Sequence, residues 1–359
     1  MEKQMKELDD IQKISQIDKS NLKQLLFDFP EQCREAKEIG KGTDFPSGYR
    51  EINNIVFTGL GGSAVGGDLL CSYLANEARV PMVVNRNYSI PEFVDSNTLL
   101  VVCSYSGNTE ETISAFEKGL KKKAEIVVIT SGGKLKTAAV EHNLPLVTIP
   151  AGLPPRAALA YSFFPALMVL AKLGIIKDKS SQIENVALVL SGLRQRLNPE
   201  VKTKDNQAKS IACDIQQGFP HIYSSSDFFG PVSYRWRTQL AENSKSLSSN
   251  HVFPELTHNE IVGWDFPKEL LEYFTVIILR DKGDNPRIAK RMDITASILK
   301  QNARSVIEVF SEGDELLSRI FSLIYIGDFV SFYLAILNGI DPTPVDRITY
   351  LKKKLTEAG

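Results

Sequence analysis

The sequence predicts an α/β fold made of two doubly wound parallel-sheet lobes, preceded by an N-terminal helical extension. Its 359 residues suffice for two domains of about 150 residues each. Short runs rich in Val and Ile alternate with longer amphipathic stretches, a pattern typical of β-α units and of a parallel sheet. Each short run ends in a polar or glycine-rich loop. We therefore expect a helical extension over residues 1–50, a first lobe over 51–195, and a second lobe with a C-terminal helix over 205–359.

The strands are expected at the short apolar runs, where β-branched residues concentrate. In the first half these runs are Ile55–Leu60, Leu99–Ser104, Ile126–Thr130 and Leu146–Ile149. In the second half they are His221–Ser224, Thr275–Arg280 and Ser305–Phe310. A polar, proline-containing linker over Gln195–Asn206 separates the halves, which share a rhythm rather than a sequence. Since ligands of such sheets bind at the carboxyl ends of the strands, the loops that follow these runs are the candidate site.

The charge and hydropathy of the chain argue against several classes of partner. Lys and Arg number 42, Asp and Glu number 43, and the formal net charge is −1. Proteins that bind nucleic acid or anionic membranes usually carry a basic surplus, so neither partner is expected. The charged N-terminus does not resemble a signal peptide. The apolar segment Ile320–Ile340 is interrupted by Asp328, Ser331 and Asn338, which favours a buried core helix over a membrane span. We expect a cytoplasmic protein.

The four cysteines give no sign of a metal site or a disulfide framework. Cys33, Cys71, Cys103 and Cys213 are scattered singly, without a C-x-x-C pair and without clustered histidines. A metal cage is therefore not expected, and free thiols in apolar surroundings fit a reducing compartment. We predict that the protein uses no metal and no other cofactor.

The first candidate loop is the glycine-rich stretch Gly59–Gly67, in which Gly61, Gly62 and Ser63 are expected to bind an anion. Backbone N–H groups can approach a phosphate closely in such a turn, and the following helix adds a partial positive charge. The spacing is G-x-G-G-S rather than G-x-G-x-x-G, and the next apolar run, Val80–Asn87, ends without an acidic residue. A dinucleotide site is therefore not favoured. A tight turn that binds nothing remains the alternative.

The second candidate loop, Ser104–Thr112, places three hydroxyl groups where a strand turns into a helix. Ser104, Ser106 and Thr109 lie at positions i, i+2 and i+5, and hydroxyl and backbone donors can surround a phosphate there without a lysine. The alternative is a helix N-cap with a capping box, which uses Asn108 or Thr109 with the following glutamates. Capping requires only one hydroxyl and does not explain Ser104 and Ser106 beside a glycine. We predict a phosphate site.

These two loops resemble the phosphate-binding signature of sugar-isomerase (SIS) domains. The stretch L-P-P-R-A-A at Leu153–Ala158, A-E-N-S-K at Ala241–Lys245 and H-N-E-I-V-G-W at His258–Trp264 follow in order. Together they resemble the bifunctional phosphoglucose/phosphomannose isomerases of archaea and some bacteria, from about residue 55 to the C-terminus. The resemblance implies two SIS lobes and an aldose–ketose isomerase. Such an enzyme interconverts glucose 6-phosphate, and mannose 6-phosphate, with fructose 6-phosphate through a cis-enediolate.

An aldose–ketose isomerisation needs a base at the two carbons and a cation near the developing oxyanion. Glu242 matches the base of the family, and it lies in an expected helix over Pro231–Leu247. The alternative is a surface glutamate paired with Arg235 or Lys245. Arg156 follows two prolines at the end of a strand–loop unit, where its guanidinium can stabilise an enediolate. For Arg156 the alternative is a salt bridge between the lobes.

The resemblance also implies groups that open the sugar ring. His258 lies in a polar loop, can titrate near neutral pH, and in the resembling family reaches into the site of a neighbouring subunit. A homodimer with a shared histidine is therefore implied. The family also places a ring-opening lysine near the C-terminus; Lys352 is the best match, with Lys353 and Lys354 as alternatives.

Two other functions compete with this interpretation. One is an SIS isomerase of an aminosugar phosphate, or of glucose 6-phosphate alone. Ammonia-transferring relatives carry a glutaminase domain with an N-terminal cysteine, which we do not find. The other is a non-catalytic sugar-phosphate sensor, which joins one SIS domain to a DNA-binding helix-turn-helix. Two lobes, a neutral charge and the lack of a basic recognition helix argue against the sensor.

Overall fold

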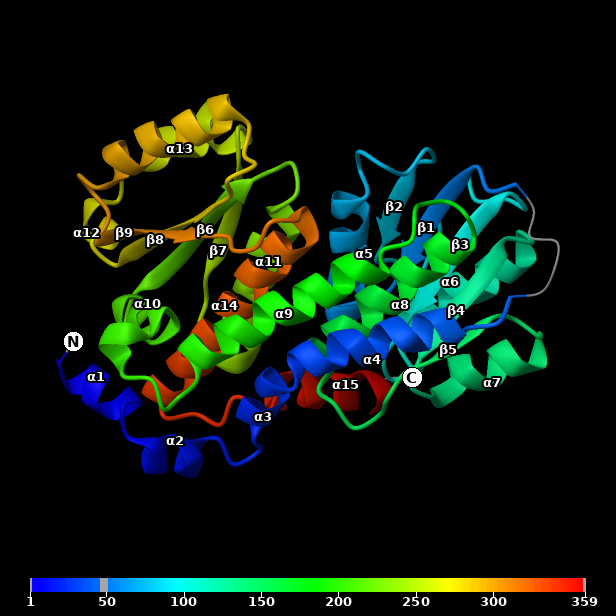
Figure 1. Ribbon diagram of the computed structural model, residues 1–359, viewed down its shortest axis with the longest axis horizontal. Helices are drawn as coiled ribbons and strands as arrows, with labels where there is room; N and C mark the ends of the chain where they lie inside the picture. The colour runs from blue at the N-terminus through cyan, green and yellow to red at the C-terminus, as the bar shows by residue number, and fades with distance from the viewer. Residues whose placement is uncertain (1, 46–50, 358–359) are drawn as a thin grey trace.

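The computed structural model describes residues 2–45 and 51–357 and contains two α/β lobes that lie side by side, joined by long helices (Figure 1). Each lobe holds one parallel sheet, of five strands in the first lobe and four in the second. Helices precede the first sheet along the chain. The architecture confirms the predicted fold class, including the helical N-terminal region.

The first sheet has the strand order β2-β1-β3-β4-β5, and neighbouring strands run parallel. Its central strand β3 is buried along its whole length, as expected for a strand that is covered on both faces and forms a continuous apolar run. The strands are β1 (Asn54–Thr58), β2 (Met82–Asn85), β3 (Thr98–Cys103), β4 (Glu125–Thr130) and β5 (Leu146–Thr148). The connecting helices are α5 (Gly62–Tyr73), α6 (Glu110–Lys121), α7 (Gly133–Glu141) and, after the 3₁₀ turn η1 (Pro155–Ala157), α8 (Leu159–Lys172).

The second sheet has the order β7-β6-β8-β9 and is also parallel. Its strands are β6 (Phe219–Ser225), β7 (Ser249–Phe253), β8 (Phe274–Arg280) and β9 (Ser305–Phe310). Its helices are α10 (Gln207–Ile215), α11 (Gly230–Asn243), α12 (Lys268–Leu271), α13 (Pro286–Leu299) and α14 (Leu316–Leu337), with the 3₁₀ turns η2 (Thr203–Asp205), η3 (Glu255–His258) and η4 (Glu260–Gly263). The edge strand β7 was not expected from the sequence.

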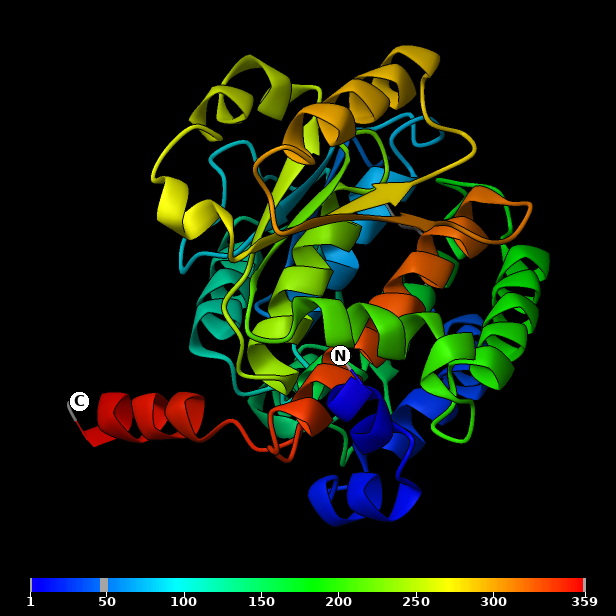
Figure 2. The ribbon, with the colours of Figure 1, turned by 90° about the vertical axis from the view of Figure 1, so that its left-hand side faces the viewer.

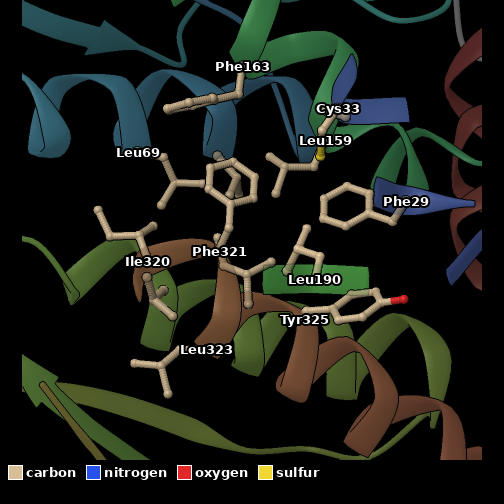
Figure 3. Close-up of a cluster of buried hydrophobic side chains, with 14 of the residues drawn as sticks. Phe29, Cys33, Leu69, Leu159, Phe163, Leu190, Ile320, Phe321, Leu323 and Tyr325 are labelled. Carbon is tan, nitrogen blue, oxygen red and sulfur yellow. The ribbon is translucent and has the colours of Figure 1, made fainter. Parts of the chain in front are cut away.

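One hydrophobic core runs through both lobes. Figure 3 shows Phe163 of α8 and Phe321 of α14 facing each other, with ring centroids 5.1 Å apart. Phe29 of α4 (Phe29–Gly42) and Leu190 of α9 (Ser180–Leu197) close the same cluster. Helix α14 is apolar and long enough to cross a membrane, but its apolar window is entirely buried within the protein. It is a core helix, as the sequence predicted.

The two ends of the chain are arranged differently. The N-terminal helices α1 (Glu2–Leu8), α2 (Ile11–Ile17) and α3 (Leu22–Phe27) lead into α4, and Leu8, Ile14 and Leu22 are buried. The C-terminal helix α15 (Asp346–Glu357) buries none of its residues. Figure 2 shows it extending away from the body of the protein.

Candidate active site

In the hydroxyl-bearing loop after β3, two of the three hydroxyls meet at the start of α6. Ser104 is buried, and its Oγ lies 2.9 Å from Oγ1 of Thr109. Thr109 is the N-cap of α6, but its side chain makes no capping hydrogen bond to that helix. Ser106 is exposed at the tip of the loop. Thr109 therefore does not act as a side-chain cap. Its hydroxyl and that of Ser104 lie at a helix N-terminus, a place where proteins can bind phosphate.

Gly107 is required by the shape of this loop. Its φ of +66° lies in the left-handed region, and a Cβ at this position would lie 1.8 Å from the carbonyl oxygen of Gly132. The Gly107 N–H donates to the carbonyl of Ser104 at 3.1 Å, and the Leu135 N–H donates to the Gly107 carbonyl at 3.0 Å. Only glycine fits here, so the loop closes tightly against the neighbouring β4–α7 turn.

The glycine-rich loop after β1 lies between the hydroxyl loop and Arg156. A Cβ on Gly59 would lie 2.7 Å from the carbonyl oxygen of Cys103, and one on Gly62 would lie 2.8 Å from that of Pro155. Gly61, with φ of +53°, makes the turn into α5. Ser63 is buried, and burial raises the pKa of the Cys103 thiol, at the end of β3, to about 12. These contacts pack the glycine-rich loop against the end of β3 on one side and against the turn that carries Arg156 on the other.

Arg156 and Glu242 meet at the junction of the two lobes. An Nη1 atom of Arg156, from the turn η1, lies 3.6 Å from Oε2 of Glu242, near the C-terminal end of α11. The Arg156 side chain is 4% exposed, whereas that of Glu242 is 30% exposed. A buried, fixed cation thus stands beside a carboxylate that solvent or a substrate can reach. The pair is a salt bridge between the two lobes, which was the alternative interpretation of Arg156. The pair nevertheless leaves the Glu242 carboxylate accessible.

The rest of the Arg156 guanidinium is occupied by hydrogen bonds. Its Nε donates to Oδ1 of Asn243 at 2.5 Å, and its Nη2 donates to the carbonyls of Pro342 and Thr343, each at 2.8 Å. Burial lowers the pKa of the Arg156 guanidinium, and the neighbouring Glu242 carboxylate opposes that shift. The side chain is therefore held in one orientation as a cation.

A second layer of buried polar groups supports this arrangement. Asp328 of α14 accepts from Arg235 at 2.7 Å and from Gln239 at 2.9 Å. Arg235 in turn donates to the backbone carbonyl of Arg156 at 3.1 Å. Burial raises the pKa of the Asp328 carboxyl, and Arg235 opposes the shift. The helical spacing places Arg235 and Gln239 near Glu242, but both are bound to Asp328. Of these three residues on α11, Glu242 is the one that is open to solvent.

Lys245 is a cation that lies beside the site. The sequence analysis gave this lysine no catalytic role. Its Nζ donates to the carbonyls of Glu242 at 2.7 Å and Pro342 at 2.9 Å. Burial is the main cause that lowers its pKa, and the neighbouring Arg156 adds to the shift. With its donors directed at carbonyls near the end of α11, Lys245 caps that helix and holds the C-terminal turn against Arg156. The sequence signal that could have pointed to Lys245 is its place in the A-E-N-S-K motif, which also contains Glu242.

His258 and Lys352 are not brought to this pair within the single chain. His258 is exposed at the end of η3 in the second lobe, and Lys352 is exposed on α15. Within residues 2–45 and 51–357, no hydrogen bond or ion pair joins either side chain to Arg156 or Glu242. The structure pairs Arg156 with Glu242 and Ser104 with Thr109, and it packs the loop of Gly61, Gly62 and Ser63 between β3 and η1. Ser106 is exposed at the tip of its own loop. Among the described residues, no three His, Cys, Asp or Glu side chains cluster as metal ligands would.

Comparisons with known proteins cover both lobes. A family model for the SIS domain matches residues 48–173, and one described as the bacterial phospho-glucose isomerase C-terminal SIS domain matches residues 204–355. A tagatose-6-phosphate ketose/aldose isomerase of Escherichia coli has the same fold, with a TM-score of 0.68 at 15% identity over 90% of this chain and 95% of that one.

Closer relatives extend the likeness from fold to sequence. A bifunctional phosphoglucose/phosphomannose isomerase of Caldicellulosiruptor bescii is 47% identical over 92% of this chain and 98% of its own length. Another, of Aquifex aeolicus, is 35% identical over 87% of this chain and 93% of its own length. The resemblance inferred from the motifs is confirmed: this chain belongs to the bifunctional phosphoglucose/phosphomannose isomerase family.

Proposed function

We propose that the protein interconverts glucose 6-phosphate and mannose 6-phosphate with fructose 6-phosphate through a cis-enediolate. The observation that carries this proposal is the Arg156–Glu242 pair, in which a buried cation lies 3.6 Å from an accessible carboxylate. The family relationship supports the substrate class. The packing of the glycine-rich loop between the strand of the hydroxyl loop and the turn of Arg156 supports a substrate with a phosphate at one end and its reacting carbons at the other.

The proposed chemistry is a proton transfer between C1 and C2 of the open-chain sugar. The Glu242 carboxylate takes the proton from C2 of the aldose, and the electron pair left behind forms the C1–C2 double bond of the enediolate. Arg156 stabilises the negative charge that develops on the sugar oxygen. The proton of the C2 hydroxyl passes to the C1 oxygen, and Glu242 then returns its own proton to C1 as the C2 oxygen becomes the ketone. The loop hydroxyls and the N-terminus of α6 bind the phosphate.

Ring opening is assigned to His258 of a second copy of the chain, in a homodimer. His258 is exposed and lies in the second lobe, away from contact with Arg156 and Glu242 of its own chain. On the segment that follows it, Val262 and Phe266 are 74% and 75% exposed. Apolar side chains so exposed beside a functional histidine support a protein interface at this segment.

Lys352 remains the proposed lysine of the site, with Lys353 and Lys354 as alternatives. All three lie on α15, a helix of 12 residues without a buried side chain. A helix of this length is marginal in water by itself, which supports its packing against a second copy. The four free thiols fit the cytoplasmic location that we propose.

Turnover of glucose 6-phosphate and mannose 6-phosphate, each assayed separately, tests this function. The wild-type protein should convert both to fructose 6-phosphate. Glu242→Gln keeps the shape of the side chain but removes the base, so turnover should fall by at least about 10². Glu117→Gln, an exposed change on α6, is the matched control and should be unaffected. Near-normal turnover by the Glu242→Gln variant would contradict the assignment of Glu242 as the base.

A further inference from the structure

The segment that carries His258 is fastened to the second sheet by its neighbours in sequence. It follows β7 and consists of the two short turns η3 and η4, with His258 at the end of the first. On one side of His258, Thr257 accepts from Nη1 of Arg291, on α13, at 2.8 Å. On the other side, Glu260 is bound to both β6 and β7. The histidine thus stands exposed between two attachment points.

Glu260 makes the attachment to the sheet. One carboxylate oxygen accepts a short hydrogen bond from the hydroxyl of Tyr223, on β6. The other lies 3.1 Å from Nε2 of His251, on β7. Tyr223 is fully buried, and its hydroxyl also accepts from Nε1 of Trp264 at 3.3 Å. Glu260 therefore links the segment to two strands through a buried partner and a half-exposed one.

The turn η4 lies between two buried anchors, Leu256 and Trp264, which pack in the core of the second lobe. The turn itself buries none of its residues, so between these anchors its position depends on polar contacts. The side chain of Asn259 accepts from the Glu260 N–H at 2.6 Å and donates to Glu255 at 2.7 Å, and both bonds stay within the segment. Between those anchors, the bonds from Glu260 to Tyr223 and His251 join the turn that follows His258 to the sheet.

We propose that Glu260 is a positioning residue for the reaction: it holds the turn that presents His258 for ring opening. This inference rests on the proposed function, in which His258 opens the sugar ring. Because both Glu260 oxygens have partners, Glu260 acts through hydrogen bonds and not as a proton acceptor from the sugar. A side chain that keeps those bonds without the charge should therefore keep the function.

The experiment compares Glu260→Ala, Glu260→Gln, His258→Ala and the double variant His258→Ala/Glu260→Ala. Each is assayed with glucose 6-phosphate, which closes to a ring, and with erythrose 4-phosphate, which cannot close to a six-membered ring. Glu260→Ala should lower turnover of glucose 6-phosphate by about tenfold or more and that of erythrose 4-phosphate by less than about threefold, since a ring-opening group has no role without a ring. Glu260→Gln should stay within about threefold of wild type, because its amide can accept from Tyr223 and donate to His251.

The double variant decides whether Glu260 acts through His258. If it does, adding Glu260→Ala to His258→Ala should cost no further turnover, because the group being positioned is gone. Losses that multiply would overturn the inference, as would equal losses on both sugars or a Gln variant as poor as Ala. His258→Ala that impairs both sugars equally would instead overturn the ring-opening role. A wild-type protein inactive on both hexose phosphates would overturn the proposed function itself.

Two further variants keep the test independent of folding. His251→Ala removes the half-exposed partner of Glu260 and leaves the buried tyrosine in place. It should lower turnover of glucose 6-phosphate by about threefold, leave erythrose 4-phosphate unchanged, and have no effect in the His258→Ala background. Glu269→Ala, an exposed carboxylate further along on α12, is the control and should match wild type on both sugars.

Discussion

Each nitrogen of the Arg156 guanidinium has its own partner in the structure. Nε binds the side chain of Asn243, Nη2 binds two backbone carbonyls, and Nη1 faces Glu242. A guanidinium can serve three directions at once because its donors form a rigid, planar fork. An ammonium is a point charge on a flexible stem and cannot occupy all three. We therefore propose that the geometry of Arg156, and not only its charge, serves the proposed reaction.

Arg156→Lys should therefore lose activity although the positive charge is kept. Turnover of glucose 6-phosphate is expected to fall by at least about tenfold, because the lysine cannot hold the enediolate oxygen and the C-terminal turn together. Steady-state kinetics measure the effect, and Arg79→Lys on the exposed surface serves as the control. Normal turnover by the Arg156→Lys variant would mean that charge alone is enough.

The loop hydroxyls should act on binding more than on the chemical step. Ser106→Ala or Thr109→Ala is expected to raise KM for the hexose phosphates by about tenfold, since a hydrogen bond to a charged group contributes about 1.5–3 kcal/mol. Thr137→Ala, exposed on α7, is the control. If both variants keep the wild-type KM, the phosphate binds elsewhere.

At the scale of elements, the apolar runs predicted the strands that position the site, but they could not predict β7. The strands β1, β3 and β8 are largely buried runs, and such runs are visible in a sequence. In contrast β7 (S-N-H-V-F) is an edge strand with one buried residue. The helix expected over Pro231–Leu247 ends earlier, at Asn243, because Lys245 adopts a left-handed φ of +55°.

The buried polar residues beneath the site could not be predicted from the sequence either. The loops were found because each is a contiguous motif, so a single stretch of sequence carries its signal. Asp328 instead meets Arg235 and Gln239 from a helix far along the chain. In the sequence it is one polar residue in an apolar helix. Only the packing of α14 against α11 reveals that it supports Arg156 through Arg235.

Strand β6 carries a histidine whose burial should make folding sensitive to acid. The pKa of His221 is lowered to about 4, mainly by burial and further by His251. Its Nδ1 lies 2.6 Å from Oγ of Ser249, and its Nε2 is buried without a partner among the described residues. Protonation would place an unpaired N–H in the apolar surroundings of Phe274 and Trp264.

Because the folded pKa lies below the unfolded value of about 6.5, the unfolded chain binds more protons between these pH values. The free energy of unfolding should thus fall as the pH decreases from about 6.5 to about 4, and His221 should contribute about 2 kcal/mol of that fall by about pH 4.5. Urea unfolding at about pH 7 and about pH 4.5 measures it. His221→Phe, which keeps an aromatic ring but cannot titrate, should show a correspondingly smaller fall. An identical pH dependence in the variant would contradict the assignment.

At the scale of the whole molecule, the two lobes share one core, so the Arg156–Glu242 junction is built on a rigid framework. Helices α8 and α14, one from each lobe, meet in stacked and edge-to-face phenylalanines (Figure 3). Yet no hydrogen bond or ion pair within residues 2–45 and 51–357 joins His258 to Arg156 or Glu242, and the C-terminal helix α15 extends away from the body (Figure 2). The proposed reaction needs a proton relay for ring opening as well as a base, and a symmetric pair of chains would supply it to each site from the neighbour.

This arrangement predicts that two inactive variants can restore one another. Glu242→Gln supplies an intact His258, and His258→Ala supplies an intact Glu242. In a hybrid dimer, one site then combines the intact residue of each chain, and the other site lacks both. Co-expression or refolding of the two variants together allows the subunits to mix.

With random pairing, about half of the dimers are hybrids and each has one intact site of two, so activity on glucose 6-phosphate should reach about a quarter of the wild-type value. Mixing each variant with itself under the same conditions gives the baseline. The rescue should also vanish in a hybrid of Glu242→Gln with the double variant Glu242→Gln/His258→Ala, since neither chain then supplies the base. If His258 instead served its own chain, every site in a hybrid would lack one of the two residues. Activity no greater than the sum of the separate variants would therefore place His258 within a single subunit.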